Sequence, residues 1–248
     1  MGAEGAWYAR RGTKLRELFT IMHLPYTSMV LSYVLIGAAL SPSIYLNRVI
    51  LTLLAYFLGL GLSAHALNEL HARHWGDALR KSELEILFVV PFVAAMLIAA
   101  YGIIVLYAAS GVLTSLVLLA FVSLESFFLF AYNTDRWSGI FHSDMSFAFS
   151  WAALPTVISY FVNASTIGIV AVLVALAMAA TAGIEINLSR WCKDIRRKNP
   201  LTEMQFADGT KSNLDAAHLI AKPEKSLKLI VVAVDLVGVG LTLHKLLS

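Results

Sequence analysis

The sequence predicts an all-α, polytopic membrane bundle with about seven transmembrane helices, and three observations lead to this fold class. First, 58% of the 248 residues are hydrophobic and only 14% are charged, too few charges to cover a water-facing surface. Second, uncharged apolar stretches of about 17–25 residues, the length that crosses a bilayer, recur along the chain. Third, lipid accepts only helices or closed barrels, and these stretches are much longer than barrel strands.

The gaps between the predicted spans alternate between basic and nearly uncharged. The spans cover about residues 26–46, 49–67, 86–108, 112–132, 145–162, 166–189 and 228–247. Of the 19 Lys and Arg residues, all except Arg48 and Lys245 lie at the N-terminus, in every second gap, or at the inner lip of the last span. Because loops rich in Lys and Arg stay in the cytoplasm, we predict a cytoplasmic N-terminus and an external C-terminus. The net charge of +3 follows from this topology and indicates no nucleic-acid partner.

Residues 1–22 precede the first predicted span and lack the apolar run of a cleavable signal peptide. They mix Arg and Lys with apolar residues such as Leu15 and Phe19, as does a helix that lies in the membrane interface. We therefore expect a cytoplasmic or interfacial N-terminal segment, followed by a single transmembrane domain over residues 23–248.

The only long polar stretch of the chain covers residues 190–227. It contains the turn-forming residues Pro200, Asp208-Gly209, Asn213 and Pro223. We predict a cytoplasmic loop here, with one short helix near Leu214–Ile220, and no β-sheet anywhere in the chain.

Polar residues gather in three clusters at the predicted cytoplasmic boundary, where an ionisable side chain is costly and usually has a partner or a task. The first follows the second span, the second precedes the fifth span, and the third closes the sixth span. The candidate site residues in these clusters are His65, Asn68, Glu69, Arg73 and Asp77, then Tyr132 and Arg136, then Glu185, Asn187, Arg190 and Asp194.

The spacing of these residues predicts a site for a diphosphate. At about 100° per residue, His65, Asn68 and Glu69 share one face of a helix. Carboxylate and amide oxygens from two facing helix ends are ligands that Mg²⁺ prefers, and Mg²⁺ keeps room for a substrate phosphate. The arginines of the three clusters would pair with that phosphate.

The order of these motifs resembles the UbiA superfamily of intramembrane prenyltransferases. The resemblance rests on the Asn68-Glu69 motif, on Tyr132 and Arg136 in a Tyr-x-x-x-Arg pattern, and on the acidic motif that begins at Glu185. It covers about residues 20–200. It implies a helical bundle with a cavity open to the membrane, in which Mg²⁺ binds a polyprenyl diphosphate. Ionisation then gives an allylic cation that alkylates an aromatic ring or a polar-headed lipid acceptor.

The resemblance also implies a role for each candidate residue. One Mg²⁺ would be held by Asn68, Glu69 and Asp77, and a second by Glu185, Asn187 and Asp194. The diphosphate would be bound by Arg73, Tyr132, Arg136 and Arg190, while His65 would shape the cavity. The sequence departs from the family pattern at Ala72 and Gly76, where the family has Asp, and it has about two spans fewer.

Two other classes of function stay open. A non-catalytic subunit of a membrane complex, which binds isoprenoid lipid or acts as a scaffold, would keep the bundle without the acidic chemistry. A small proton-coupled transporter would use Glu125 and Asp235, which lie within predicted spans where an unpaired carboxylate is costly. For all three classes we expect membrane lipids as partners and the cytoplasmic membrane of a bacterium or archaeon as the location.

Overall fold

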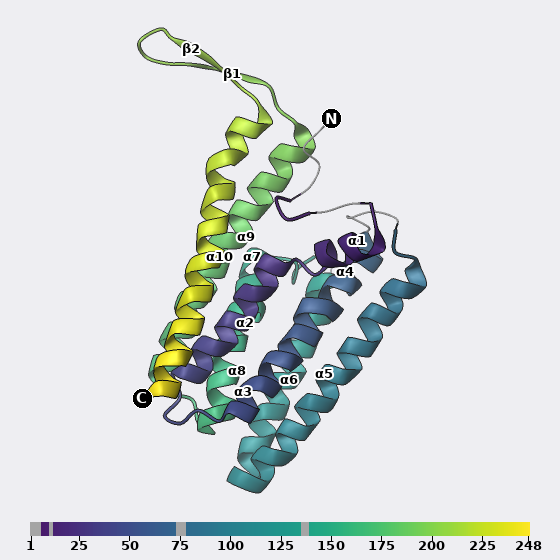
Figure 1. Ribbon diagram of the computed structural model, residues 1–248, viewed down its shortest axis with the longest axis vertical. Coiled ribbons are helices and arrows are strands. Elements are labelled where there is room, and N and C mark those ends of the chain that lie inside the picture. The colour runs from purple at the N-terminus through teal and green to yellow at the C-terminus, as the bar shows by residue number, and fades with distance from the viewer. Residues whose placement is uncertain (1–5, 10–11, 73–77, 135–138) are drawn as a thin grey trace.

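The computed structural model describes residues 6–9, 12–72, 78–134 and 139–248, and this part of the chain is an all-α bundle with one small β-hairpin (Figure 1). The predicted fold class is confirmed. Within the described ranges, six helices are long and apolar enough to cross a membrane, and a helix pair bent by 44° makes a seventh. The two ends of the chain lie toward opposite ends of the bundle, as an odd number of crossings requires. The chain is a multi-pass membrane protein.

The first half contains α1 (Lys14–Ile21), α2 (Leu24–Ala39), α3 (Leu46–Tyr56), the π-helical segment η1 (Phe57–Ala64), α4 (His65–Ala72) and α5 (Lys81–Ser110). The second half contains α6 (Val112–Asn133), α7 (Asp144–Ala148), the π-helical segment η2 (Phe149–Ala153), α8 (Leu154–Ala164), α9 (Ile169–Lys198), β1 (Thr202–Gln205), β2 (Lys211–Leu214) and α10 (Ala216–Leu247). Two of the spans are each made up of three consecutive elements: α3, η1 and α4 form one, and α7, η2 and α8 form the other.

Helix α2 forms the centre of the bundle, where α8 and α10 pack closely against it. A Cβ atom at Gly37 of α2 would lie 2.1 Å from the carbonyl oxygen of Thr156 on α8. A Cβ atom at Gly238 of α10 would lie 2.9 Å from both the Cβ and the carbonyl oxygen of Ser32 on α2. Small residues let helices in lipid approach this closely, and close approach is what holds them together there.

Hydrogen bonds reinforce the contact between α2 and α10. Ser28 Oγ and Ser32 Oγ each donate to the Asp235 carboxylate, both over 2.8 Å. Asp235 is therefore bound to its neighbouring helix and has a structural role.

The first span is shorter than predicted, because α2 ends at Ala39 and not near residue 46. Ser41 Oγ donates to the carbonyl oxygens of Ala38 and Ser43, each over 2.6 Å. These bonds, with Pro42 next in the chain, favour a turn in place of further helix.

Two π-helical segments interrupt spans that the hydropathy pattern predicts as regular helices. Segment η1 contains Gly59 and Gly61, and Pro155 is the second residue after η2. Glycine and proline both weaken a regular helix. A π turn holds an extra residue, and such segments are frequent at functional sites. Each segment therefore changes the face that the following residues present to the bundle.

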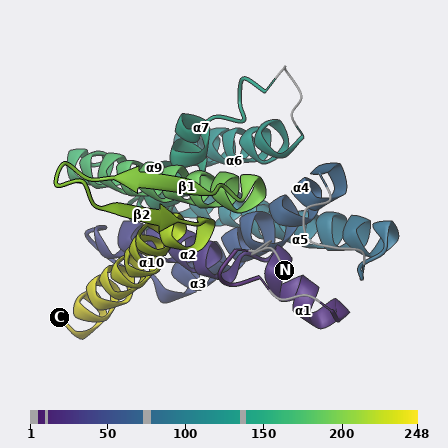
Figure 2. The same cartoon turned by 90° about the horizontal axis from the view of Figure 1, so that it is seen from above.

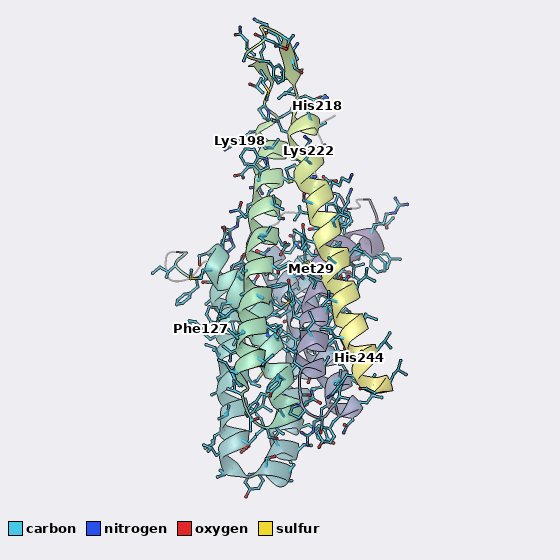
Figure 3. The ribbon with its side chains drawn as sticks, turned by 90° about the vertical axis from the view of Figure 1, so that its left-hand side faces the viewer. Met29, Phe127, Lys198, His218, Lys222 and His244 are labelled. Carbon is cyan, nitrogen blue, oxygen red and sulfur yellow. The ribbon has the colours of Figure 1, made fainter. Side chains whose placement is uncertain are left out.

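The predicted loop over 190–227 is wrong, and so is the predicted absence of strands. Helix α9 continues to Lys198, α10 already begins at Ala216, and β1 and β2 form an antiparallel hairpin between them. Figure 3 shows Lys198, His218 and Lys222 on the part of α9 and α10 that rises beyond the bundle, with Met29 deep inside it.

Packing explains why these helices continue outside the membrane. Cys192 on α9 and Ile220 and Leu227 on α10 form a small buried cluster. Arg196 of α9 also pairs with Glu224 of α10. Hydropathy does not reveal such a paired extension, because its surface is charged.

Enlarging Gly37 should destabilise the bundle, since any Cβ at this position collides with the backbone of α8. We expect Gly37→Leu to lower the free energy of unfolding by about 1–3 kcal/mol, as other overpacking substitutions do, and to lower the melting temperature measured in detergent. Gly183→Ala is the matched control, because no atom lies within 4 Å of the Cβ it would add. Equal melting temperatures for the two variants would contradict the proposed packing of α2.

The N-terminus of α10 should be sensitive to acid through Asp215. Its side chain accepts from the backbone N–H of His218 over 2.9 Å, and this bond, with the His218 side chain, lowers the pKa of Asp215. The cap is therefore complete above the ordinary aspartate pKa of about 3.9 and is lost as the pH falls through the lower pKa of the folded state. Hydrogen-exchange protection factors of the amides at 216–219 should fall only in that acidic range, whereas Asp215→Ala should lower them at pH 7.

Candidate functional site

The candidate site lies where α1 meets α2, close to the ends of α4 and α6 and beside the part of α9 that carries Glu185 and Arg190, at the predicted cytoplasmic boundary. Figure 2 views the bundle from the end that carries α1. His23 joins α1 to α2 in a left-handed conformation, with φ of 47°. This bend turns the chain from the boundary into the bundle, and it brings the side chains of the N-terminal segment over the start of α2.

Aromatic rings form one wall of the site. The ring centroid of Tyr8 lies 5.5 Å from those of both His23 and Tyr26. Trp7 packs edge-on to Tyr8 with centroids 5.4 Å apart, and the Lys228 ammonium of α10 lies 5.2 Å above the Trp7 ring. Burial, Tyr26 and Glu185 raise the pKa of Tyr8 well above its usual value, so the phenol stays protonated.

His65 is buried at the junction of η1 and α4, and it contacts rings from two other elements. Its ring centroid lies 4.3 Å from that of His23 and 5.1 Å from that of Trp151 in η2. The two π-helical segments thus meet through this pair of residues. His65 Nε2 is buried and has no hydrogen-bond partner in the described structure.

Glu185 is buried in α9, with 3% of its surface exposed. Four tyrosines, from the N-terminal segment, α2 and α6, lie within electrostatic range of its carboxyl group: Tyr8, Tyr26, Tyr33 and Tyr132. Tyr26 also donates to Ser189 Oγ, one turn from Glu185, over 3.4 Å. No hydrogen bond from a described residue reaches the Glu185 carboxyl group. The site therefore has a buried acid with four phenol groups in its neighbourhood.

Arg190 supplies the positive charge of the site. Its Nη1 lies 2.5 Å from Asp144 Oδ1 at the start of α7, and it lies beside Tyr132. Arg190 Nη2 is buried and lacks a partner among the described residues. Tyr132 is fixed in turn by stacking on His142, with centroids 4.6 Å apart. A buried N–H without a partner is costly, and an anionic group could satisfy it.

The fold buries some of the candidate residues predicted from the sequence and leaves others exposed. Glu69 and Glu185 are both buried, with 2% and 3% exposed, and Asn68 is half-buried. Asn187 and Asp194 are exposed, because they lie about 200° and 180° around α9 from Glu185. The structure therefore does not bring Asn187 and Asp194 to the side of α9 that carries Glu185.

Three candidates, Arg73, Asp77 and Arg136, lie outside the described residues. Among the residues that the structure describes, no group of three or more His, Cys, Asp or Glu side chains could hold a metal ion. The predicted pair of Mg²⁺ sites stays a prediction, because Asp77, one of its ligands, lies outside the described residues.

Several residues of the site were not singled out from the sequence. Tyr26 and Tyr33 are seven residues apart and so lie on one helix face, a signal that was present but has the same form as ordinary core packing. The contact between Trp151 and His65 depends on the two π-helical segments, which leave no clear mark in the sequence.

Comparisons with protein families, with curated proteins and with solved structures found no match to this chain.

Proposed function

We propose that the inner-boundary site, made up of Tyr8, Tyr26, His65, Tyr132, Glu185 and Arg190, binds a polyprenyl diphosphate and transfers the prenyl chain to a lipid or aromatic acceptor. The observation that carries this proposal is the pair of buried nitrogens without partners, His65 Nε2 and Arg190 Nη2, in an enclosure of aromatic rings. A ligand with phosphate oxygens would satisfy Arg190, and an apolar chain would suit the rings. The proposal assigns the protein to the cytoplasmic membrane.

The charges of the site suit the two ends of the breaking bond. Arg190 would neutralise the diphosphate, because a guanidinium pairs with two phosphate oxygens at once. The carboxylate of Glu185 and the faces of the surrounding tyrosines would stabilise the allylic cation, since cations are attracted to aromatic faces. The two groups are five residues, about 1.4 turns, apart on α9, and both lie within electrostatic range of Tyr132, so Tyr132 would lie between the two ends of the substrate.

The reaction can be written with these residues alone. The bond between C1 of the prenyl chain and the bridging oxygen breaks, and its electron pair leaves with the diphosphate. The acceptor forms a new bond to C1 with its own electron pair and loses a proton, which Glu185 accepts.

A second candidate is binding of an isoprenoid lipid without turnover. One observation favours it: no metal-binding group of acids is found among the described residues, and prenyl transfer in the resembling family depends on such groups. A proton-coupled transporter has less support, because Asp235 is bound by two serines.

Neutralising Arg190 and Glu185 should affect different steps. We expect Arg190→Gln to weaken binding of labelled farnesyl diphosphate about 10- to 100-fold, the loss that follows removal of a charge-assisted hydrogen bond. Glu185→Gln should retain binding and lower the release of pyrophosphate at least tenfold. Binding and pyrophosphate release are measured on purified protein in nanodiscs, with a mixture of lipid and aromatic acceptors and Mg²⁺ present.

Glu85→Gln is the matched control, because Glu85 is an exposed glutamate on α5, and it should behave as the unmodified protein does. Binding of the labelled diphosphate with no pyrophosphate released for any acceptor would replace transfer with lipid binding. Unchanged binding in Arg190→Gln would contradict both candidates.

A further inference from the structure

A cavity lies between α3, α5 and α6, with α8 behind it. It shares no residue with the inner-boundary site. Its volume is about 150 Å³, and its walls are almost entirely apolar. These three helices lie side by side in Figure 1. A cavity of this size, lined by apolar side chains, admits a ring or a single hydrocarbon chain and is too small for the two chains of a phospholipid.

Small residues on facing helices create this space. They are Ala55 and Gly59 from the second span, and Ala95, Ala99 and Gly102 from α5. A Cβ atom at Gly59 or Gly102 would make only ordinary contacts, at 3.9 and 3.7 Å. These glycines therefore do not serve close helix packing, unlike Gly37, and their effect is to leave room.

One polar pair lies in this apolar space. Tyr56 Oη donates to Glu125 Oε1 over 2.7 Å, and both side chains line the cavity. Glu125 Oε2 is buried and has no partner in the described structure. Glu125 lies in the middle third of α6, where a carboxyl group with an unpaired oxygen is costly in a bilayer.

The cavity opens at a rim that carries Asn47 and Tyr101, and 53% of Tyr101 is exposed. Arg48 is the only cation among the described lining residues. Its Nη1 donates to the Val162 carbonyl oxygen over 2.8 Å, and its guanidinium lies 4.5 Å above the Tyr45 ring. These contacts hold the guanidinium at Val162 and Tyr45, and Tyr56 and Glu125 form the polar pair of the cavity.

We infer that this cavity binds a single-chain apolar alcohol, with the hydroxyl group at Glu125 Oε2 and the chain along the small residues of α5. A hydroxyl both donates and accepts, so it pairs with a carboxyl group whether that group is ionised or protonated. The inference does not depend on the function proposed for the inner-boundary site.

A photoactivatable pair of probes tests this site. The protein in nanodiscs is irradiated with octanol that carries a diazirine near its hydroxyl end, and separately with the matching diazirine alkane. Labelled peptides are identified by mass spectrometry. We expect the alcohol to label the cavity walls on α3, α5 or α6 about tenfold more than the alkane, the preference that one hydrogen bond to a buried carboxyl group gives.

Two variants and a control separate the site from the lipid-facing surface. Glu125→Leu should reduce labelling by the alcohol to the level of the alkane, and Ala99→Phe should abolish labelling by both because it fills the cavity. Leu97→Phe, on the exposed face of α5, should leave labelling unchanged. Equal labelling by alcohol and alkane in the unmodified protein, or labelling that Ala99→Phe does not change, would overturn the inference. Ala99→Phe keeps the test decisive if Glu125→Leu does not fold.

Discussion

The close approach of the α2 backbone to α8 and α10 is the constraint on which the rest of the structure depends. Lipid gives helices no hydrophobic reason to associate, so packing and hydrogen bonds between them carry the bundle. At Gly37 and Gly238 the neighbouring helices come too close for any side chain, and Asp235 adds two hydrogen bonds to α2. Because α2 also carries Tyr26 and Tyr33, the contacts that hold the bundle together hold one wall of the inner-boundary site.

Hydropathy and basic residues predicted the bundle well, because lipid imposes a length and a charge pattern that a sequence displays directly. That signal stops at the membrane surface. Ser41 ends α2 through local hydrogen bonds, and Arg190–Lys198 stays helical because α10 packs against it. Asp208-Gly209 was recognised as a turn, yet the pairing of β1 with β2 across it has no counterpart in hydropathy.

The sequence predicted only part of the candidate site. Glu69 and Glu185 were both expected among its residues, and both are buried. Spacing along α9 could have separated Asn187 and Asp194 from Glu185, since helical geometry alone puts them on other faces. The aromatic neighbours come from α2, η2 and the N-terminal segment, and contacts between such distant segments are not encoded in any local pattern.

The two π-helical segments have a consequence for how this protein tolerates change. A substitution within η1 or η2 leaves the number of residues between the span ends intact, whereas the loss or gain of one residue rotates everything beyond it by about 100°. Such a rotation would turn His65 away from Trp151. Chain length in 57–64 and 149–153, more than the identity of the side chains there, therefore sets the register of the inner-boundary site.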